Sequence, residues 1–176
     1  MPSCLDNKAQ VVFPGYYPLG FSNEYAFANF IFGIVNHADM PDDVQPVFHG
    51  SSVTGESYDT RRPFDQGRVS DYDIAIVSET LWNRVLDKGV GTRTSTKRTG
   101  ELQSEDITVL QLSTVFSWAS DLVRACSTQA RPVHFMIYAD QAGATQGRAA
   151  LVTYLDTSKP KGRRKLLLTQ LCGTLG

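Results

Sequence analysis

The sequence contains no run of apolar residues long enough to cross a lipid bilayer, which argues against a transmembrane helix. Its first residues also lack the basic and then apolar order of a signal peptide. We therefore expect synthesis without export, a cytoplasmic site of action and no membrane partner. Only three cysteines are present, Cys4, Cys126 and Cys172, and their odd number and wide spacing predict neither a disulfide framework nor a metal knuckle. We interpret Cys126 as a core thiol.

An excess of charge of one sign is also missing, because 17 basic and 18 acidic side chains leave a formal net charge of −1. The charges are nevertheless uneven along the chain. Residues 157–176 carry five basic side chains and no acid, and Arg93, Lys97 and Arg98 lie in a stretch rich in Gly, Thr and Ser. Each cluster has an alternative interpretation as a solvated tail or loop. If both clusters lay near the aspartates Asp71 and Asp73 described below, they would favour RNA as a partner.

The residues that are present suit one globular unit. A chain of 176 residues, 41% apolar and 20% charged, is large enough to bury a sizeable core. We expect a single domain over 1–176. Within it we expect an irregular N-terminal arm at 1–20, a core at 21–156 and a basic C-terminal extension at 157–176.

Hydrophobic periodicity predicts an α/β or α+β fold, in which helices flank a small mixed sheet of at least three strands. Asn23 and Ser78 have the position of N-caps before two amphipathic helices. A third, longer helix opens at Ser104 and its apolar stripe runs to Cys126. The other elements that we expect are strands at 45–49, 71–77 and 131–138, a polar loop at 90–103 and a helix at 141–155.

Two aspartates stand close together on the second expected strand, in the sequence Ser70-Asp71-Tyr72-Asp73-Ile74-Ala75-Ile76-Val77. Because side chains alternate along a strand, Asp71 and Asp73 project from one face, while Tyr72 and Ile74 lie on the other. Two such carboxylates repel each other unless a cation lies between them, and oxygen ligands favour Mg²⁺ or Mn²⁺. A solvated strand end is the alternative interpretation.

The first expected strand ends in a turn of small residues, Gly50-Ser51-Ser52. Such a turn offers free backbone N–H groups and two hydroxyls, and it lets an anion such as phosphate approach the main chain. An ordinary tight turn capped by serine is the alternative. The turn and the aspartates together predict metal-dependent chemistry on a nucleotide.

A strand, a Gly-Ser turn and an Asp-x-Asp strand resemble the nucleotidyltransferase superfamily related to DNA polymerase beta. The closer resemblance is to the small nucleotidyltransferase-like domains that form toxin modules at the C-termini of bacterial polymorphic and contact-dependent toxins. Residues 50–73 are similar to that group's G-S-S-x-T-G, P-F and S-D-x-D pattern. Residues 131–138 are similar to its final core strand, so the resemblance covers most of 45–140.

The resemblance implies transfer of an NMP from an NTP to a hydroxyl of tRNA, a protein or a small molecule. It assigns Asp71 and Asp73 as catalytic metal ligands and places Gly50, Ser51 and Ser52 at the phosphates. Mg²⁺, or Mn²⁺, would be the cofactor. A toxin of this kind would be delivered into another cell and would have a neutralising partner protein.

The chain departs from the superfamily pattern by an insertion, Thr54 to Arg68, between the turn and the aspartates. Three arginines lie in this insertion: Arg61, Arg62 and Arg68. If the insertion folded back, a guanidinium would meet the triphosphate bidentately. Surface arginines on a flexible loop are the alternative interpretation.

A second departure is the third carboxylate of the superfamily, which is missing from the strand at 131–138. Alternation places His134 on one face of that strand with Met136 and Tyr138, where it could point toward the aspartates. A structural histidine is the alternative. The missing acid also motivates a second hypothesis, a catalytically inactive module of the same fold that binds nucleotide or RNA.

A third hypothesis is a P-loop NTPase, because residues 50–57 match the pattern G-x-x-x-x-G-K-[ST] at every position except the lysine. Glu56 stands at that position and reverses the sign of the charge that should meet the phosphates. The sequence therefore argues against this hypothesis. The nucleotide base and the acceptor depend on pocket contacts that no motif here encodes.

Overall fold

The structure is a computed structural model and describes residues 11–12, 17–57, 59–146, 149–155 and 166–171. Eight strands in this part of the chain form one mixed sheet in the order β1-β8-β7-β2-β3-β6-β5-β4. The strands are β1 (Val11–Val12), β2 (Gln45–His49), β3 (Tyr72–Val77), β4 (Thr92–Arg93), β5 (Arg98–Thr99), β6 (Val133–Tyr138), β7 (Ala150–Leu155) and β8 (Leu166–Leu171). The helices are α1 (Glu24–Asn36), α2 (Ser51–Thr54), α3 (Glu79–Asp87), α4 (Ser104–Val109), α5 (Ser113–Cys126) and α6 (Gln141–Thr145). The expected α+β class, with helices flanking a mixed sheet, is confirmed.

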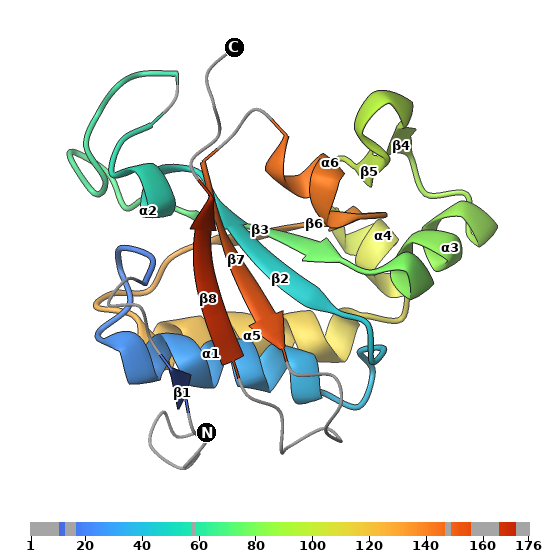
Figure 1. Cartoon of the computed structure of the whole chain (residues 1–176), viewed down its shortest axis with the longest axis horizontal. Helices are drawn as coiled ribbons and strands as arrows, with labels where there is room; N and C mark the ends of the chain where they lie inside the picture. The colour runs from blue at the N-terminus through green and yellow to red at the C-terminus, as the bar shows by residue number, and fades with distance from the viewer. Residues whose placement is uncertain (1–10, 13–16, 58, 147–148, 156–165, 172–176) are drawn as a thin grey trace.

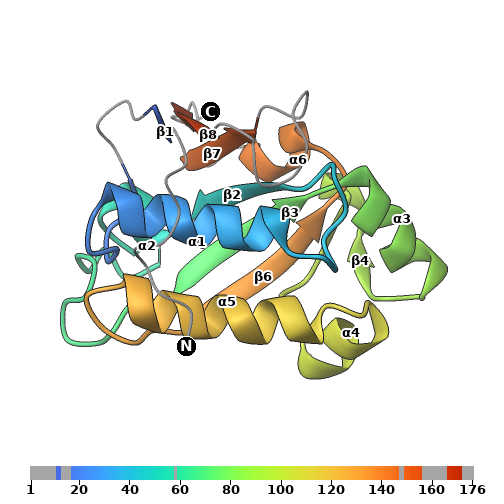
Figure 2. The same ribbon diagram turned by 90° about the horizontal axis from the view of Figure 1, so that it is seen from below.

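The two faces of the sheet are covered unequally. Helices α1 and α5 lie side by side against one face, as Figure 2 shows. Their apolar side chains form the main core with inward-facing strand residues, and Phe116 of α5 stacks on Phe135 of β6 with ring centroids 4.0 Å apart. The short helix α6 packs on β3 and β6 from the opposite side (Figure 1). A smaller apolar cluster lies under α6 and includes Val77, Tyr138 and Ala144.

The centre of the sheet joins segments that are far apart in the sequence. β2 pairs with β3 in antiparallel register, with His49 opposite Asp73. β3 pairs with β6 in parallel register, with Asp73 beside His134. The ends of three central strands therefore meet at one place, which is where the predicted site residues stand.

Local signals placed the first helices correctly. The side chain of Asn23 accepts a hydrogen bond from the N–H of Ala26 at the start of α1, and Ser78 does the same for Leu81 in α3. Both residues are the N-caps that the sequence predicts. Asp43 accepts hydrogen bonds from the hydroxyl of Ser78 and the N–H of Thr80, which ties the start of α3 to the loop before β2.

The expected long helix from Ser104 is in fact two helices, α4 and α5. The break lies at Gln111, whose φ of 59° is left-handed. Leu110 and Leu112 on either side of it are both fully buried. Residues two apart on a continuous helix point in nearly opposite directions, so both leucines reach the core only because the helix is broken between them.

The expected helix at 141–155 is wrong beyond its first turns. α6 ends at Thr145, and residues Ala150–Leu155 form β7, which lies between β2 and β8. Leu151 and Val152 belong to the clusters on opposite faces of the sheet. A strand buried on both faces has an unbroken apolar sequence, which periodicity does not separate from a helix.

The ends of the chain contribute more to the sheet than the sequence suggested. Val11–Val12 of the expected irregular arm pairs in parallel with Leu166–Leu167, and the expected basic extension contains β8, which pairs along its length with β7. The rest of the arm up to residue 16 and the five bases of the extension lie outside the described residues. The expected polar loop at 90–103 holds the short strands β4 and β5 and a 3-10 turn, Thr94–Thr96.

Cys126 is fully buried at the end of α5, as expected of a core residue. It is disulfide-bonded rather than a free thiol, which corrects that interpretation. No other cysteine stands among the described residues. None of the helices in the described part of the chain combines the length and the apolar character needed to span a bilayer.

Candidate functional site

Asp71, Asp73 and His134 converge where β3 and β6 begin. The Nδ1 atom of His134 lies 3.5 Å from Oδ2 of Asp71 and 3.8 Å from Oδ1 of Asp73. One ligand atom from each of the three residues lies within 4.8 Å of the others, which is close enough for them to hold a single metal ion. Their side chains are 27%, 39% and 32% exposed respectively, so a ligand can reach the cluster from solvent.

Strand geometry accounts for this convergence. Tyr72 and Ile74 face the main core, where the ring of Tyr72 stacks on Phe21 with centroids 4.8 Å apart. Asp73 therefore faces the opposite side of the sheet. The parallel register places His134 beside it on that same side, with Met136 farther along β6. The buried alternate positions thus hold the acids on the face away from α1 and α5.

Gly50 brings the turn after β2 against this cluster. Its φ of 71° lies in the region that favours glycine, and a Cβ atom at this position would be only 2.6 Å from Oδ2 of Asp73. Glycine is therefore required for two reasons: the backbone has a positive φ, and the Asp73 carboxylate leaves no room for a side chain. The turn therefore lies directly against the cluster of Asp71, Asp73 and His134.

The two serines of the turn have different surroundings. The hydroxyl of Ser52 is buried and donates to the carbonyl of His49 at 3.1 Å, so its proton is already used within the protein. The Ser52 hydroxyl is thus not a free phosphate donor, contrary to the sequence-based expectation. Ser51 is half-buried and opens α2, and the first N–H groups of a helix have no acceptor within it. The backbone and the Ser51 hydroxyl remain available to an anion.

Glu101 is a site neighbour that the sequence did not indicate. Its Oε1 atom lies 3.6 Å from Nε2 of His134, whereas the aspartates lie near the other ring nitrogen, Nδ1. Glu101 follows β5, and the N–H of the next residue, Leu102, donates to the carbonyl of Phe135 on β6. Pairing of this segment with β6 brings Glu101 near His134, 33 positions away, and no local motif marks it. The imidazole is therefore flanked by three carboxylates.

Among the described residues, none of the three arginines of the insertion forms an ion pair with Asp71 or Asp73. Arg61 pairs with Glu56 at 2.7 Å on the surface, which occupies its guanidinium. Arg62 and Arg68 are exposed. Their role at a triphosphate stays a prediction.

A different arginine, Arg131, holds the insertion in place. Its fully buried guanidinium donates to both carboxylate oxygens of Asp65 at 3.1 Å and to the carbonyl of Ser70 at 2.8 Å. It also lies between the rings of Phe64 and Tyr72, at 4.9 and 5.0 Å. The insertion is thus fixed immediately before the strand that carries the aspartates.

Burial alone would raise the pKa of the Asp65 carboxyl. Hydrogen bonds from Arg131, Ser70 and Gln129, together with the charge of Arg131, outweigh that effect and hold the pKa below its usual value. Asp65 therefore stays ionised at neutral pH. Burial raises the pKa of the neighbouring Tyr72 hydroxyl to about 12, so this phenol stays neutral.

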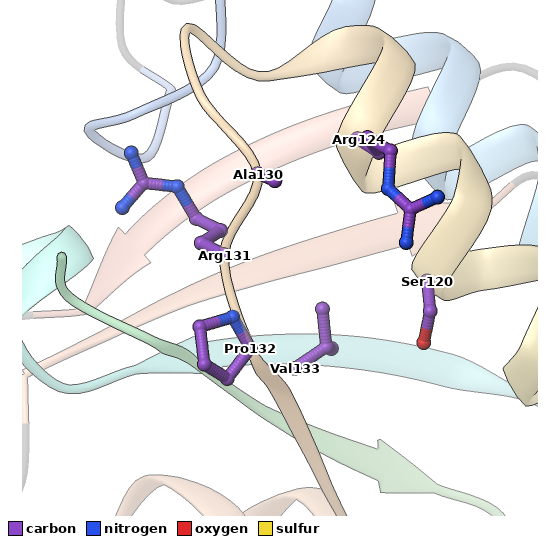
Figure 3. Close-up of a pocket in the computed structure, with 6 residues that line it drawn as sticks. All are labelled: Ser120, Arg124, Ala130, Arg131, Pro132 and Val133. Carbon is purple, nitrogen blue, oxygen red and sulfur yellow. The ribbon is translucent and has the colours of Figure 1, made fainter.

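A hollow of about 380 Å³ lies elsewhere, beside α5 and the segment that leads into β6 (Figure 3). Its lining consists of Ser120, Arg124, Ala130, Arg131, Pro132 and Val133. In Figure 3 the guanidinium of Arg131 points away from Arg124 and Ser120, in keeping with its bond to Asp65. None of the predicted site residues lines this hollow, so the cluster of Asp71, Asp73 and His134 remains the candidate site.

The donor set fits a divalent cation. Carboxylate oxygens are the ligands that Mg²⁺ and Mn²⁺ prefer, and an ion between Asp71 and Asp73 would remove their mutual repulsion. An imidazole nitrogen at His134 adds a ligand that a transition metal such as Mn²⁺ accepts more readily than Mg²⁺ does. The residues present therefore suit the cofactor that the sequence predicts.

Comparisons of this chain with protein-family models, with curated proteins and with solved structures found no match. A functional interpretation therefore depends on the residues and geometry described above.

Proposed function

We propose that this protein is a metal-dependent nucleotidyltransferase, which transfers an NMP from an NTP to a hydroxyl of tRNA, a protein or a small molecule. One observation carries the proposal: the carboxylate of Asp73 packs against the backbone of Gly50, while His134 lies against Asp73 and Asp71. An anion-binding turn and a metal-binding cluster are thereby in direct contact. This arrangement supports the resemblance to the DNA polymerase beta-like superfamily.

In the proposed reaction, Asp71 and Asp73 would hold the ion, and His134 would add an imidazole nitrogen as a third ligand. The N–H groups of Ser51 and Ser52 and the Ser51 hydroxyl bind the phosphates. The acceptor hydroxyl attacks the α-phosphorus, the bond to the β-phosphate oxygen breaks, pyrophosphate leaves and the hydroxyl proton passes to solvent. A bound divalent ion supplies neutralisation of the charge on the phosphoryl oxygens, which is the main requirement of such a site.

The test is incubation with each α-³²P-labelled NTP, Mg²⁺ or Mn²⁺, total tRNA and cell extract, followed by gel analysis. We expect the wild type to label RNA or protein and Asp73→Asn to label neither. Asp87→Asn is a matched control, because Asp87 is an exposed aspartate at the end of α3, outside the site. Label transferred equally well by Asp73→Asn would rule out the metal site.

A second candidate is a catalytically inactive module of the same fold that binds nucleotide or RNA. It is favoured by β6, the strand that resembles the one carrying the superfamily's third carboxylate, because β6 contains no acidic residue. Mg²⁺-dependent NTP binding without release of pyrophosphate would identify this case. A P-loop NTPase is less well supported, because Glu56 is paired with Arg61 and only the four-residue α2 follows the turn.

Toxicity and a neutralising partner protein belong to the same proposal, through the resemblance to toxin modules. The toxicity is tested by induced expression inside bacterial cells. We expect the wild type to arrest growth, and Asp73→Asn to be tolerated at the same protein level. Equal growth with both proteins would contradict the toxin role. The transfer reaction would still be tested by the labelling experiment.

A further inference from the structure

A short basic hairpin stands on the same face of the sheet as the candidate metal cluster. Arg93 of β4 is the register partner of Arg98 of β5, and Arg98 is in turn the register partner of Tyr138 of β6. Residues directly opposite each other on antiparallel strands project from the same face. Alternation along β6 puts Tyr138 on the face of His134. Both arginines therefore project from the face that bears the acids.

Contacts of the Arg98 side chain agree with this register. Its Nη1 atom lies 3.6 Å from the sulfur of Met136, and its guanidinium carbon lies 5.8 Å from the centre of the Tyr138 ring. Met136 is two residues along β6 from His134, a rise of about 7 Å. The guanidinium of Arg98 thus contacts the residue two positions along β6 from His134 of the candidate metal cluster. The Gly50 turn lies on the other side of β6, because β2 and β3 precede β6 in the sheet and β5 follows it.

The charges of this hairpin are not neutralised within the described part of the chain. Arg61, Arg124 and Arg131 each pair with an acid there, whereas Arg93, Lys97 and Arg98 have no ion pair. Arg98 is instead held by a sulfur atom and an aromatic ring, which orient its N–H groups but supply no negative charge to pair with it. Like charges directly opposite on neighbouring strands repel. An external anion would relieve that repulsion.

The hairpin is held firmly at its base. The N–H of Ala139 donates to the carbonyl of Lys97 at 2.9 Å, and the N–H of Ile137 donates to the hydroxyl of Thr99 at 3.0 Å. Gly143 of α6 packs so closely on the carbonyl of Thr96 that a Cβ atom there would be 2.7 Å from it. The basic side chains are thus presented from a fixed backbone.

We infer that the β4–β5 hairpin binds the phosphate backbone of an RNA acceptor and directs one of its hydroxyls to the metal cluster. This inference rests on the proposed function and names the acceptor class. The order across the sheet is the Gly50 turn, the aspartates, His134 and then the hairpin, so the NTP phosphates and the acceptor approach from opposite sides. Exposed hydroxyls at Thr92, Thr94 and Ser95 add donors suited to phosphate oxygens.

The test is binding of total tRNA in EDTA, measured by filter retention over a series of salt concentrations, so that no transfer chemistry is required. We expect Arg93→Gln and Arg98→Gln each to weaken binding and to reduce the slope of log K against log salt by about 0.9 per lost phosphate contact. Arg124→Gln on α5 is the matched control and should leave both quantities unchanged. Arg93 is exposed, so Arg93→Gln tests the inference even if Arg98→Gln impairs folding.

Failure of the inference is distinguishable from failure of the proposed function. Wild-type affinity and salt slope in both hairpin variants, or no tRNA binding by the wild type, would overturn the RNA surface. Label found only on protein, with equal yield from Arg93→Gln, would overturn it too while leaving the transferase intact. Binding that depends on the hairpin, with no pyrophosphate released from any NTP, would support the RNA surface and contradict the transferase.

Discussion

At Gly50, a single hydrogen atom in place of a side chain makes room for the carboxylate of Asp73. We expect Gly50→Ala to displace the Asp73 carboxylate and to weaken Mn²⁺ binding at least about tenfold, because the added carbon would overlap Oδ2. Gly55→Ala is a close control: its φ of 83° carries the same backbone strain, but its Cβ would meet nothing within 4 Å. Titration calorimetry with Mn²⁺ measures both.

If the two alanine variants bound Mn²⁺ equally, the contact between the turn and Asp73 would have no role in the site. Both variants are expected to lose at least about 1 kcal/mol of stability, because alanine is strained at positive φ. Gly50→Ala is expected to lose more, because its Cβ also meets the Asp73 carboxylate. The comparison thus separates backbone strain from displacement of the ligand.

Asp65 makes stability depend on pH in acid. Its pKa is lowered in the folded protein, so its contribution is fully present above its unfolded pKa of about 3.9 and is lost as the pH falls through the folded pKa. We expect Asp65→Asn to lower the free energy of unfolding by about 3 kcal/mol at neutral pH, because it leaves the buried Arg131 guanidinium without its counter-charge. The difference from the wild type should shrink below pH ~4.

Urea unfolding from neutral to acid pH measures this difference, with Asp87→Asn as a control that should differ little at any pH. A deficit for Asp65→Asn that stayed constant down to the lowest pH would contradict the assigned role of the carboxylate. The substitution is also expected to loosen the insertion, since Asp65, Ser70 and Arg131 together fix it before β3.

Between elements, the close approach of α1 and α5 depends on Gly33, because a methyl group there would overlap the ring of Trp118. Alanine is favoured over glycine inside a helix by about 1 kcal/mol. We nevertheless expect Gly33→Ala to destabilise the protein by about 1–3 kcal/mol, since overpacking outweighs helix propensity. In a Trp118→Leu background the same change should cost much less, because only the flexible end of Leu122 would still lie within 3.0 Å of the added carbon. A double-mutant cycle by thermal unfolding measures the coupling.

A stabilising effect of Gly33→Ala in the wild-type background would mean that α1 and α5 are less tightly packed than described. That cycle also checks the placement of α5, which the sequence merged with α4. The merger was wrong because the left-handed residue between the helices, Gln111, is neither glycine nor asparagine and gives no local sign of a break. By contrast, side-chain caps at Asn23 and Ser78 were predictable because a cap is a local interaction.

For the whole molecule, ion binding and folding are linked. Metal that binds only the folded state should raise its stability by about 2.7 kcal/mol at a concentration 100 times Kd. We expect Mg²⁺ or Mn²⁺ to raise the melting temperature of the wild type and EDTA to reverse the rise. Asp73→Asn should show no rise, yet without metal it should be at least as stable as the wild type, because the repulsion between Asp71 and Asp73 is removed.

Scanning calorimetry with and without the ion measures this linkage, and Asp87→Asn should behave like the wild type. An equal rise for Asp73→Asn would mean that the ion binds elsewhere on the molecule. The experiment does not involve a nucleotide, so it tests the metal cluster independently of the transfer reaction.

The sequence alone determined the features that depend on neighbours along the chain: the facing of Asp71 and Asp73, the turn at Gly50, two helix caps and the α+β class. Strand alternation and capping repeat over a few residues, so local physics is enough to predict them. Only the tertiary structure decided that His134 and Glu101 join the acids, that Arg131 rather than another arginine holds the insertion, and that β7 is a strand. Those features follow from register between segments distant in sequence, which is set by packing of the whole sheet and leaves no pattern in any one segment.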